Sequence, residues 1–257
     1  MAGRAQLWTL VALLSLGCAR VVGSSGPTDV ARQQVHATGV SDFDAYFIEL
    51  HRIQVGVAPL GGELSQLETE LALAAGRDRL TSRQVLEKTL AESAARLREA
   101  GTKLALSLEG LAEHEPPPED EEPPREFVAR RDAKGEIEVR FVVEGNAPAA
   151  EDRAWLDAAK KAAKGAARVV AQSSELGWRA RILQPHTELL ERRVEAEFRL
   201  LGPAKTGDVR RNLMDAKPEF PRLRKASEQA RVDGLELLQM LERVLNEPAP
   251  AKAAPKK

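Results

Sequence analysis

Cys18 is the single cysteine of this 257-residue chain, and its position limits what its thiol can do. One cysteine cannot form a disulfide within the chain, so this is not a small secreted domain held together by disulfides. The thiol closely follows a mostly apolar run, Leu7–Leu16, and an N-terminal segment with Arg4 and no acidic residue. The run is shorter than the roughly 20 residues that cross a bilayer, but it fits the hydrophobic part of a signal peptide. A thiol in this position indicates lipidation.

The other reactive residue types do not fall into catalytic or metal-binding patterns. No serine lies in a Gly-x-Ser-x-Gly turn, and no glycine-rich segment carries the Lys-Ser/Thr of a P-loop. The four histidines, His36, His51, His114 and His186, form neither a His-Glu-x-x-His zinc motif nor the Glu-x-x-His motifs of a di-iron bundle. We therefore predict no catalytic, cofactor-binding or metal-binding residue and a chain that is not an enzyme. An enzyme whose residues are dispersed along the sequence is the alternative.

Residues 15–18, Ser-Leu-Gly-Cys, resemble the lipobox that ends the signal peptides of bacterial lipoproteins. The glycine and the cysteine match the lipobox, and the serine stands where leucine is usual. The resemblance implies a signal peptide over residues 1–17, acyl chains on Cys18 and a chain anchored to a membrane of the cell envelope. The residue after the cysteine is Ala19 and not an aspartate. This resembles the class of bacterial lipoproteins that is sorted to the outer membrane, facing the periplasm. An ordinary signal peptide cut after Gly23, with loss of Cys18, is the alternative.

The composition favours an elongated helical body and excludes one class of partner. Hydrophobic residues make up 43% of the chain, but aromatic residues make up 4%, so each helix buries little area. Charged residues make up 30%, a share typical of soluble helical proteins with solvated faces. The 38 basic and 39 acidic residues nearly cancel, with a net charge of -1. Without a basic field the chain has no electrostatic basis for binding nucleic acid.

The first helical block covers residues 41–113. A helix is predicted from Ser41 to Val57, and a second one resumes after Pro59 and continues to Gly76. Thr81 and the glutamine three residues later form a capping-box pattern at the start of a third, long helix. Leucines near heptad spacing extend the predicted third helix through the block, at Leu86, Leu90, Leu97, Leu104, Leu108 and Leu111.

The second helical block covers residues 146–247. Its first helix is rich in alanine, which would let a neighbouring helix approach closely. The predicted elements are a helix from Asp152 to about Arg181, a segment started by Pro185 and stopped by Gly202-Pro203, a loop or short helix over Lys205–Lys217, and a last helix from Pro218 to about Asn246. Aromatic side chains in both blocks either anchor the core or line a ligand cavity: Phe43, Tyr46, Phe47 and Trp155.

Two segments between the blocks are not helical in pattern. Residues 114–126 combine prolines with a run of acidic residues and read as an exposed linker. Residues 127–145 alternate apolar and polar side chains around Asp132–Gly135, which predicts a β-hairpin with strands at Phe127–Ala129 and Ile137–Val143. The hairpin and the linker form the candidate contact surface.

Taken together, these patterns predict a mainly α fold, an elongated antiparallel helical bundle with a small β-hairpin insertion. Residues 18–40 are expected to form a flexible tether and residues 248–257 a disordered tail. We expect a membrane-anchored, non-catalytic structural or adaptor component of the bacterial cell envelope, which contacts the membrane through its lipid and another envelope protein through its body. The alternative is a periplasmic binding protein that holds an apolar ligand within its bundle.

Overall fold

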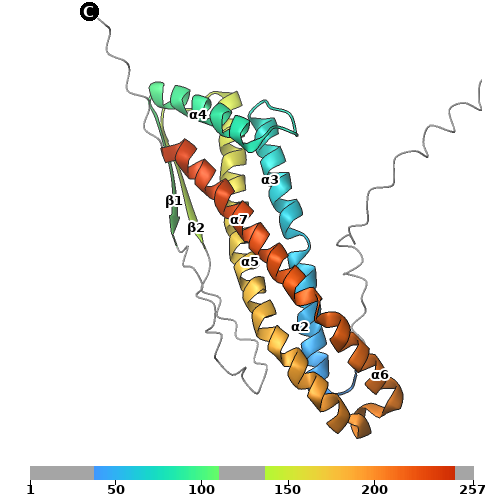
Figure 1. Ribbon diagram of the computed structural model, residues 1–257. Helices are drawn as coiled ribbons and strands as arrows, with labels where there is room; N and C mark the ends of the chain where they lie inside the picture. Colours follow the sequence, from blue (N-terminus) through green and yellow to red (C-terminus); the bar gives the residue numbers. More distant parts are fainter. Residues whose placement is uncertain (1–37, 110–136, 247–257) are drawn as a thin grey trace, which may run out of the picture.

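A single helix, α5 (Ala150–Ala196), runs along the molecule from one end to the other (Figure 1). Its 47 residues correspond to about 70 Å, at roughly 1.5 Å per residue. The computed structural model describes residues 38–109 and 137–246. Within these ranges every other element packs against α5 or against α7, which itself packs against α5.

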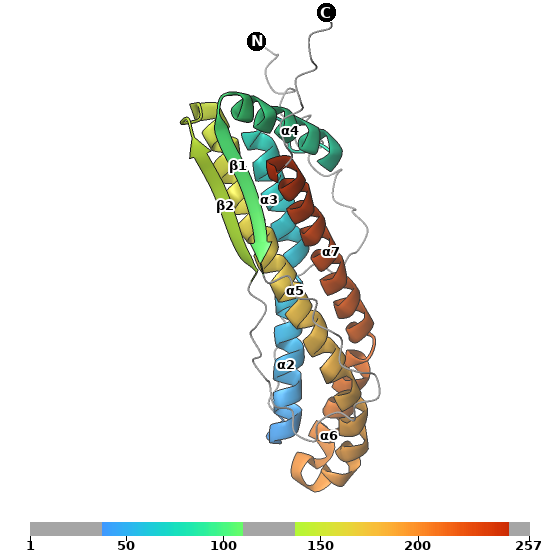
Figure 2. The same ribbon diagram turned by 90° about the vertical axis from the view of Figure 1, so that its left-hand side faces the viewer.

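The other elements surround α5 in a simple order. Two helices follow it along one side, a third packs along another side, and short elements close the two ends (Figures 1 and 2). They are α2 (Ser41–Val57), α3 (Leu60–Ala74), α4 (Arg83–Glu99), β1 (Thr102–Glu109), β2 (Glu138–Gly145), α6 (Phe198–Ala216) and α7 (Glu219–Asn246). No helix in this part of the chain is both long enough and apolar enough to cross a membrane.

α2, α3 and α7 run antiparallel to α5, whereas α4 lies across the upper end of the bundle (Figure 1). Arg193, near the end of α5, pairs with Asp42 at the start of α2 at 2.5 Å, whereas Lys161, near its beginning, pairs with Glu70 on α3. α2 and α3 therefore ascend along α5 as it descends. β1 and β2 form one antiparallel pair beside the upper half of α5 (Figure 2). The predicted class, a mainly α antiparallel bundle with a small β-hairpin, is confirmed.

Two hydrophobic clusters follow one another along α5. The upper cluster joins α3, α4, β1, the first half of α5 and the second half of α7. The lower cluster joins α2, the second half of α5, α6 and the start of α7. Leu176 packs against both clusters. The periodic apolar residues of each helix supply these cores, as their spacing of three and four predicts.

Small residues let the central helices approach one another. A Cβ atom at Gly165 of α5 would lie 2.5 Å from Leu67 Cδ1 of α3. A Cβ atom at Gly234 of α7 would lie 2.8 Å from Val170 Cγ2 of α5. Both separations are shorter than van der Waals contact. The predicted close approach to the alanine-rich helix is therefore confirmed at these glycines.

The leucine pattern predicts that the long third helix continues beyond Glu99, and this prediction is wrong. α4 ends at Glu99, and Gly101 adopts a left-handed conformation with φ of 90°. Residues Thr102–Glu109 then form β1. Leu104 and Leu108 fit a helical stripe, but together with the intervening Leu106 they also alternate as a strand requires. The helix starts after Ser82 rather than Thr81, and the Ser82 side chain makes no capping hydrogen bond.

Pro185 does not begin a new helix. It lies within α5, which continues to Ala196. The proline removes one helical hydrogen bond, but the turn that follows it buries Thr187 and Leu190 against the lower cluster, which stabilises the continuous helix. Residues 205–217 were expected as a loop or short helix, and all of them except the C-cap Lys217 belong to α6.

Gly202 and Pro203 mark a real break at the predicted position. Gly202 has φ of 72° and ψ of 166°, which no helix contains, and it kinks α6 near its start. The helix resumes at Pro203, since the fixed φ of proline suits a first helical turn. The kink turns the chain back along α5.

Candidate interaction surface

Several predicted sites lie outside the described residues. Cys18, the signal peptide, most of the tether, the acidic linker 114–126 and the tail belong to this group, as do His36 and His114. The predicted strand Phe127–Ala129 also lies there. β2 covers most of the second predicted strand, but its partner among the described residues is β1, whose strand character the sequence reading missed.

The β1–β2 pair has one face toward the helices and one toward solvent. Its inward face pairs apolar residues of the two strands: Leu104 with Val143, Leu106 with Phe141, and Leu108 with Val139. Leu104 and Leu106 of β1 are buried, and Leu106 is 1% exposed. The β2 members remain half-buried or exposed. Burial therefore falls from β1 to β2, toward the margin of the molecule.

Asn246, the last residue of α7, closes the outer edge of β1. Its side-chain Oδ1 accepts a hydrogen bond from the Leu106 N–H at 2.8 Å, and its Nδ2 donates to the Leu106 carbonyl oxygen at 2.8 Å. The amide thus pairs with Leu106 as a neighbouring strand would. Both backbone groups of Leu106 consequently point away from β2.

The position of Asn246 also fixes which groups β2 presents on its free edge. In an antiparallel pair, residues alternate between those bonded across the pair and those whose backbone groups point outward. Phe141 faces Leu106 in the register, so its N–H and C=O point away from β1, and the same holds for Val139 and Val143. Within the described residues no hydrogen bond satisfies these groups. Among the described residues β2 therefore has an open edge of three alternate residues, and it lies at the margin of their fold (Figure 2).

Charged side chains cover the solvent face of the pair. Lys103 lies 3.6 Å from Glu144 across the strands, and Arg140 lies within 3.4 Å of both Glu109 and Glu138. The hydrogen bond to Glu138, followed by the charge of Glu109, raises the pKa of Arg140 above its usual value. These exposed pairs contribute little stability, but they keep this face solvated. The apolar open edge and the charged face are therefore distinct surfaces.

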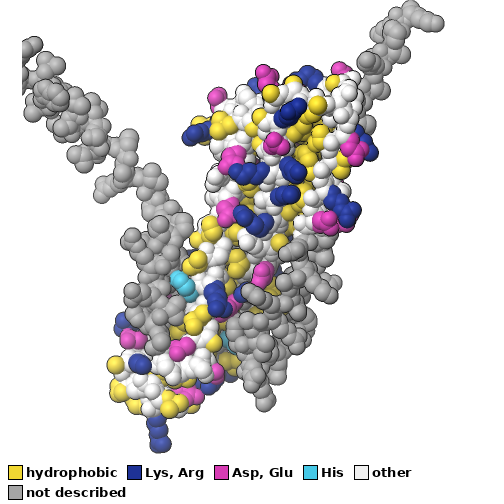
Figure 3. All heavy atoms as spheres, turned by 180° about the vertical axis from the view of Figure 1, so that it is seen from behind, with side chains coloured by type: hydrophobic (Ala, Val, Ile, Leu, Met, Phe, Trp, Pro, Cys, Tyr) yellow, Lys and Arg dark blue, Asp and Glu magenta, His cyan; other side chains and the backbone are white. Residues whose placement is uncertain are grey.

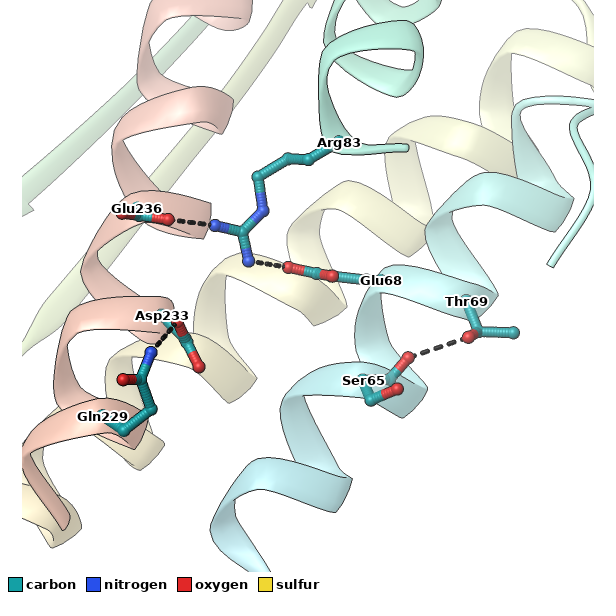
Figure 4. A network of polar contacts seen from close by, with 7 residues as sticks. All are labelled: Ser65, Glu68, Thr69, Arg83, Gln229, Asp233 and Glu236. Carbon is teal, nitrogen blue, oxygen red and sulfur yellow. Dashed lines mark hydrogen bonds and ion pairs between the residues drawn. The ribbon is translucent and has the colours of Figure 1, made fainter. Parts of the chain in front are cut away.

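Arg83 holds α4 in place above the sheet. It lies at the start of α4 and reaches between α3 and α7, where it pairs with Glu68 and with Glu236 (Figure 4). Flanking hydrogen bonds within α3 and α7 link Thr69 to the carbonyl of Ser65 and Gln229 to Asp233. The Arg98 guanidinium donates a hydrogen bond to the Val244 carbonyl at 2.7 Å near the other end of α4. Both ends of α4 are thus fixed to the bundle.

The described chain enters at the opposite end of the molecule. The Asp44 carboxylate accepts hydrogen bonds from the Thr38 N–H and hydroxyl and from the Gly39 N–H. Burial opposes ionisation, but these bonds and the charge of Lys205 hold the pKa of Asp44 below its usual value. Lys205 of α6 also donates to the Thr38 carbonyl at 2.9 Å. The entering backbone is therefore fixed to α2 and α6.

The four aromatic residues considered for a ligand cavity do not gather around one site. Phe43 and Tyr46 are buried in the lower cluster, and Phe47 packs against its margin. Trp155 is buried in the upper cluster. The Tyr46 hydroxyl lies 2.7 Å from Thr187 Oγ1, and burial raises its pKa above the usual value. These side chains anchor two separate parts of the core.

The two described histidines lie on neighbouring helices without forming a metal site. His51 is half-buried on α2, and His186 is nearly buried on α5, where its Nδ1 lies 3.1 Å from the Ile182 carbonyl oxygen. The described ranges contain no group of three histidine, cysteine, aspartate or glutamate residues that could hold a metal ion.

Glu49 is buried and pairs with Arg179 at 2.9 Å, and this ion pair joins α2 to α5.

Comparisons with protein-family models, with curated proteins and with solved structures found no match to this chain. The candidate surface therefore stands on geometry alone. The surface depends on β1 and on Asn246, and one pattern in the sequence could have predicted β1. The alternation of Leu104, Leu106 and Leu108 directly after Gly101 is the pattern of a strand that follows a helix stop.

Proposed function

We propose that this chain is a lipid-anchored, non-catalytic adaptor of the bacterial cell envelope. In this proposal Cys18 carries acyl chains, and the anchoring membrane is the outer membrane, with the body in the periplasm. The support is the lipobox-like segment at residues 15–18 and the apolar run before it. Each buried methylene group contributes about 0.8 kcal/mol of membrane binding, so more than one acyl chain is enough for stable attachment.

One structural observation supports the adaptor role more than any other. The chain enters at one end of α5, beside α6, while the β1–β2 pair lies beside the other half of that helix (Figure 1). Cys18 precedes Thr38 by 20 residues, and a flexible coil of that length would have a root-mean-square end-to-end distance of about 25 Å. An anchor at one end and an open strand edge beyond the middle are the arrangement that an adaptor needs.

The open edge of β2 indicates the kind of partner. Three outward backbone positions, at Val139, Phe141 and Val143, can bond an added strand, and their half-exposed side chains give it an apolar border. Exposed strand edges bind extended segments of other proteins by this means. The proposed partner is therefore an envelope protein that presents an extended, partly apolar segment.

The anchor is tested by replacing the acylated thiol. Cys18→Ala should move the protein from the membrane fraction to the soluble fraction, while Ser25→Ala, beyond the lipobox, should leave it in the membrane fraction. Metabolic labelling with a fatty acid should mark the parent chain and not the Cys18→Ala variant. Persistent membrane association of the unlabelled variant would contradict the proposal.

The docking edge is tested by a pair of substitutions at one residue. Val143→Pro removes an outward N–H and leaves the bonds between β1 and β2 intact, whereas Val143→Thr keeps the N–H and the β-branched shape. Crosslinking in native envelopes should capture the same partner with the parent chain and Val143→Thr, and lose it with Val143→Pro. Equal capture by both variants would exclude strand addition at β2.

A further inference from the structure

The turn between α5 and α6 exposes large apolar side chains at the end of the molecule. Leu200 is 72% exposed and Phe198 is 44% exposed. Pro203 and Ala204, after the kink, are exposed as well. We call residues 198–204 the tip. Large exposed apolar side chains within one turn, at one extremity of the molecule, indicate a surface that a partner covers.

The local backbone explains why these residues face outward. Leu201 is buried in the lower cluster, and the left-handed Gly202 then reverses the chain. Leu200 lies one residue, or roughly 100° around the helix, from the inward-facing Leu201, and its side chain is exposed. The exposed apolar surface is thus built by a fixed kink, and it is not a frayed helix end.

The tip itself contains a basic residue and no acidic one, and the carboxylates just before it, Glu195 and Glu197, are paired with Arg210 and Arg193. Residues 198–207 contain Arg199 and Lys205 and no acidic residue. Arg199 is exposed and has no hydrogen-bond or ion-pair partner among the described residues. The space-filling view shows hydrophobic side chains at the lower end of the molecule with a basic side chain projecting beyond them (Figure 3). Apolar side chains bordered by arginine and lysine are typical of surfaces that lie in the interface of a bilayer.

The tip lies at the end where the chain enters. Lys205 Nζ, one residue beyond the tip, bonds to the Thr38 carbonyl oxygen. Thr38 is separated from Cys18 by 20 residues, and a flexible coil of that length has a root-mean-square end-to-end distance of about 25 Å, so an anchor at Cys18 would keep the tip near the bilayer surface. The length of this segment and the point where it joins the body favour a lipid surface as the occupant of the tip.

We propose that the tip inserts into the headgroup region of the membrane that holds the lipid anchor. Phe198 and Leu200 enter the interface, and Arg199 contacts lipid phosphate groups. This inference rests on the proposed lipid anchor and adds an orientation to it. α5 then stands away from the membrane, and the β1–β2 pair is held clear of the surface.

Fluorescence quenching tests this contact at two matched positions. Leu80, in the connection between α3 and α4, is 97% exposed and lies at the opposite end of the molecule, so it is the control for Leu200. The chain beginning at Cys18, the mature form under the proposed function, is coupled through its single thiol to a maleimide phospholipid in vesicles of phosphatidylethanolamine and phosphatidylglycerol. Quenching by brominated lipids is then measured for Leu200→Trp and Leu80→Trp, each against the parent chain.

Quenching of the Leu200→Trp signal should be at least about two times that of Leu80→Trp, because interfacial side chains sit about 5–10 Å into the headgroup boundary. Equal quenching at both positions would overturn the inference. So would a dimer in sedimentation that Leu200→Ser dissolves, since a second copy would then cover the tip. The chemical coupling supplies the anchor whether or not Cys18 is acylated in cells. The quenching assay therefore tests the contact of the tip, whereas failure of fatty-acid labelling at Cys18 would contradict only the proposed function.

Discussion

Replacing Asn246 tests how the sheet is held, because this one side chain closes the edge of β1. Asn246→Ala removes two hydrogen bonds of 2.8 Å to Leu106, whose side chain is buried. A hydrogen bond of this type contributes about 0.5–1.5 kcal/mol net. Asn246 is itself exposed, so water can reach the vacated groups in part. We expect the free energy of unfolding to fall by about 1–2 kcal/mol.

Amide hydrogen exchange gives the sharper measurement. A loss of about 1–2 kcal/mol in the local opening free energy speeds exchange of the Leu106 amide by roughly 5–30 times. Asn246→Asp keeps an acceptor for the Leu106 N–H and loses the donor, so protection of this amide should fall less than in Asn246→Ala. Asn212→Ala, at an exposed asparagine of α6, is the control for the residue change alone. Unchanged Leu106 exchange in Asn246→Ala would refute the assignment of the β1 edge, and with it the identity of the open edge on β2.

Three further substitutions probe the body. Tyr46→Phe removes the hydroxyl bonded to the buried Thr187 and should lower the free energy of unfolding by about 1 kcal/mol in urea; an unchanged value would count against this bond. The hydrogen bonds that lower the pKa of Asp44 stabilise the fold above the unfolded pKa of about 3.9, and this contribution is lost as pH falls through the folded value. Asp44→Asn should therefore be less stable than the parent at pH 7, with a gap that closes in acid; a gap independent of pH would contradict this. Gly145→Ala should lower the free energy of unfolding by about 2 kcal/mol or more, because φ is 105° at Gly145 and a Cβ atom there would lie 2.4 Å from the Gly101 carbonyl oxygen. Amide hydrogen exchange in β1 and β2 that equals that of the parent chain would disprove this.

The sequence allowed most of the helical plan to be predicted, because helices bury a stripe that repeats locally. α2 has the expected bounds, and α7 begins and ends within a residue of the expected positions. The errors occur where a local rule competes with a distant contact. Pro185 is a helix breaker by its backbone chemistry, but burial of the next turn against α2 and α6 outweighs its cost.

The sheet could not be predicted from local pattern for a different reason. β1 and β2 are separated by residues 110–137, and β1 packs against α4 and α7 while β2 packs against α5. The bond between Asn246 and Leu106 joins residues 140 positions apart. No spacing rule links an asparagine at a helix end to a strand so distant in the chain. The candidate surface thus depends on tertiary contacts, while the lipidation predicted for Cys18 rests on the sequence alone.

A continuous α5 has a consequence for any role that depends on distance. Leu176 packs against both hydrophobic clusters, and it also fills the space beside Gly56 of α2, where a Cβ atom would lie 2.9 Å from Leu176 Cδ1. The two halves of the body are therefore joined by shared packing as well as by one helix, and a bend between them would have to break both. If the tip rests on the membrane, the distance of β2 from the bilayer is set by the helix rather than by the tether. Lengthening the tether would then leave that distance unchanged, whereas a body that floats on its tether would move away with it.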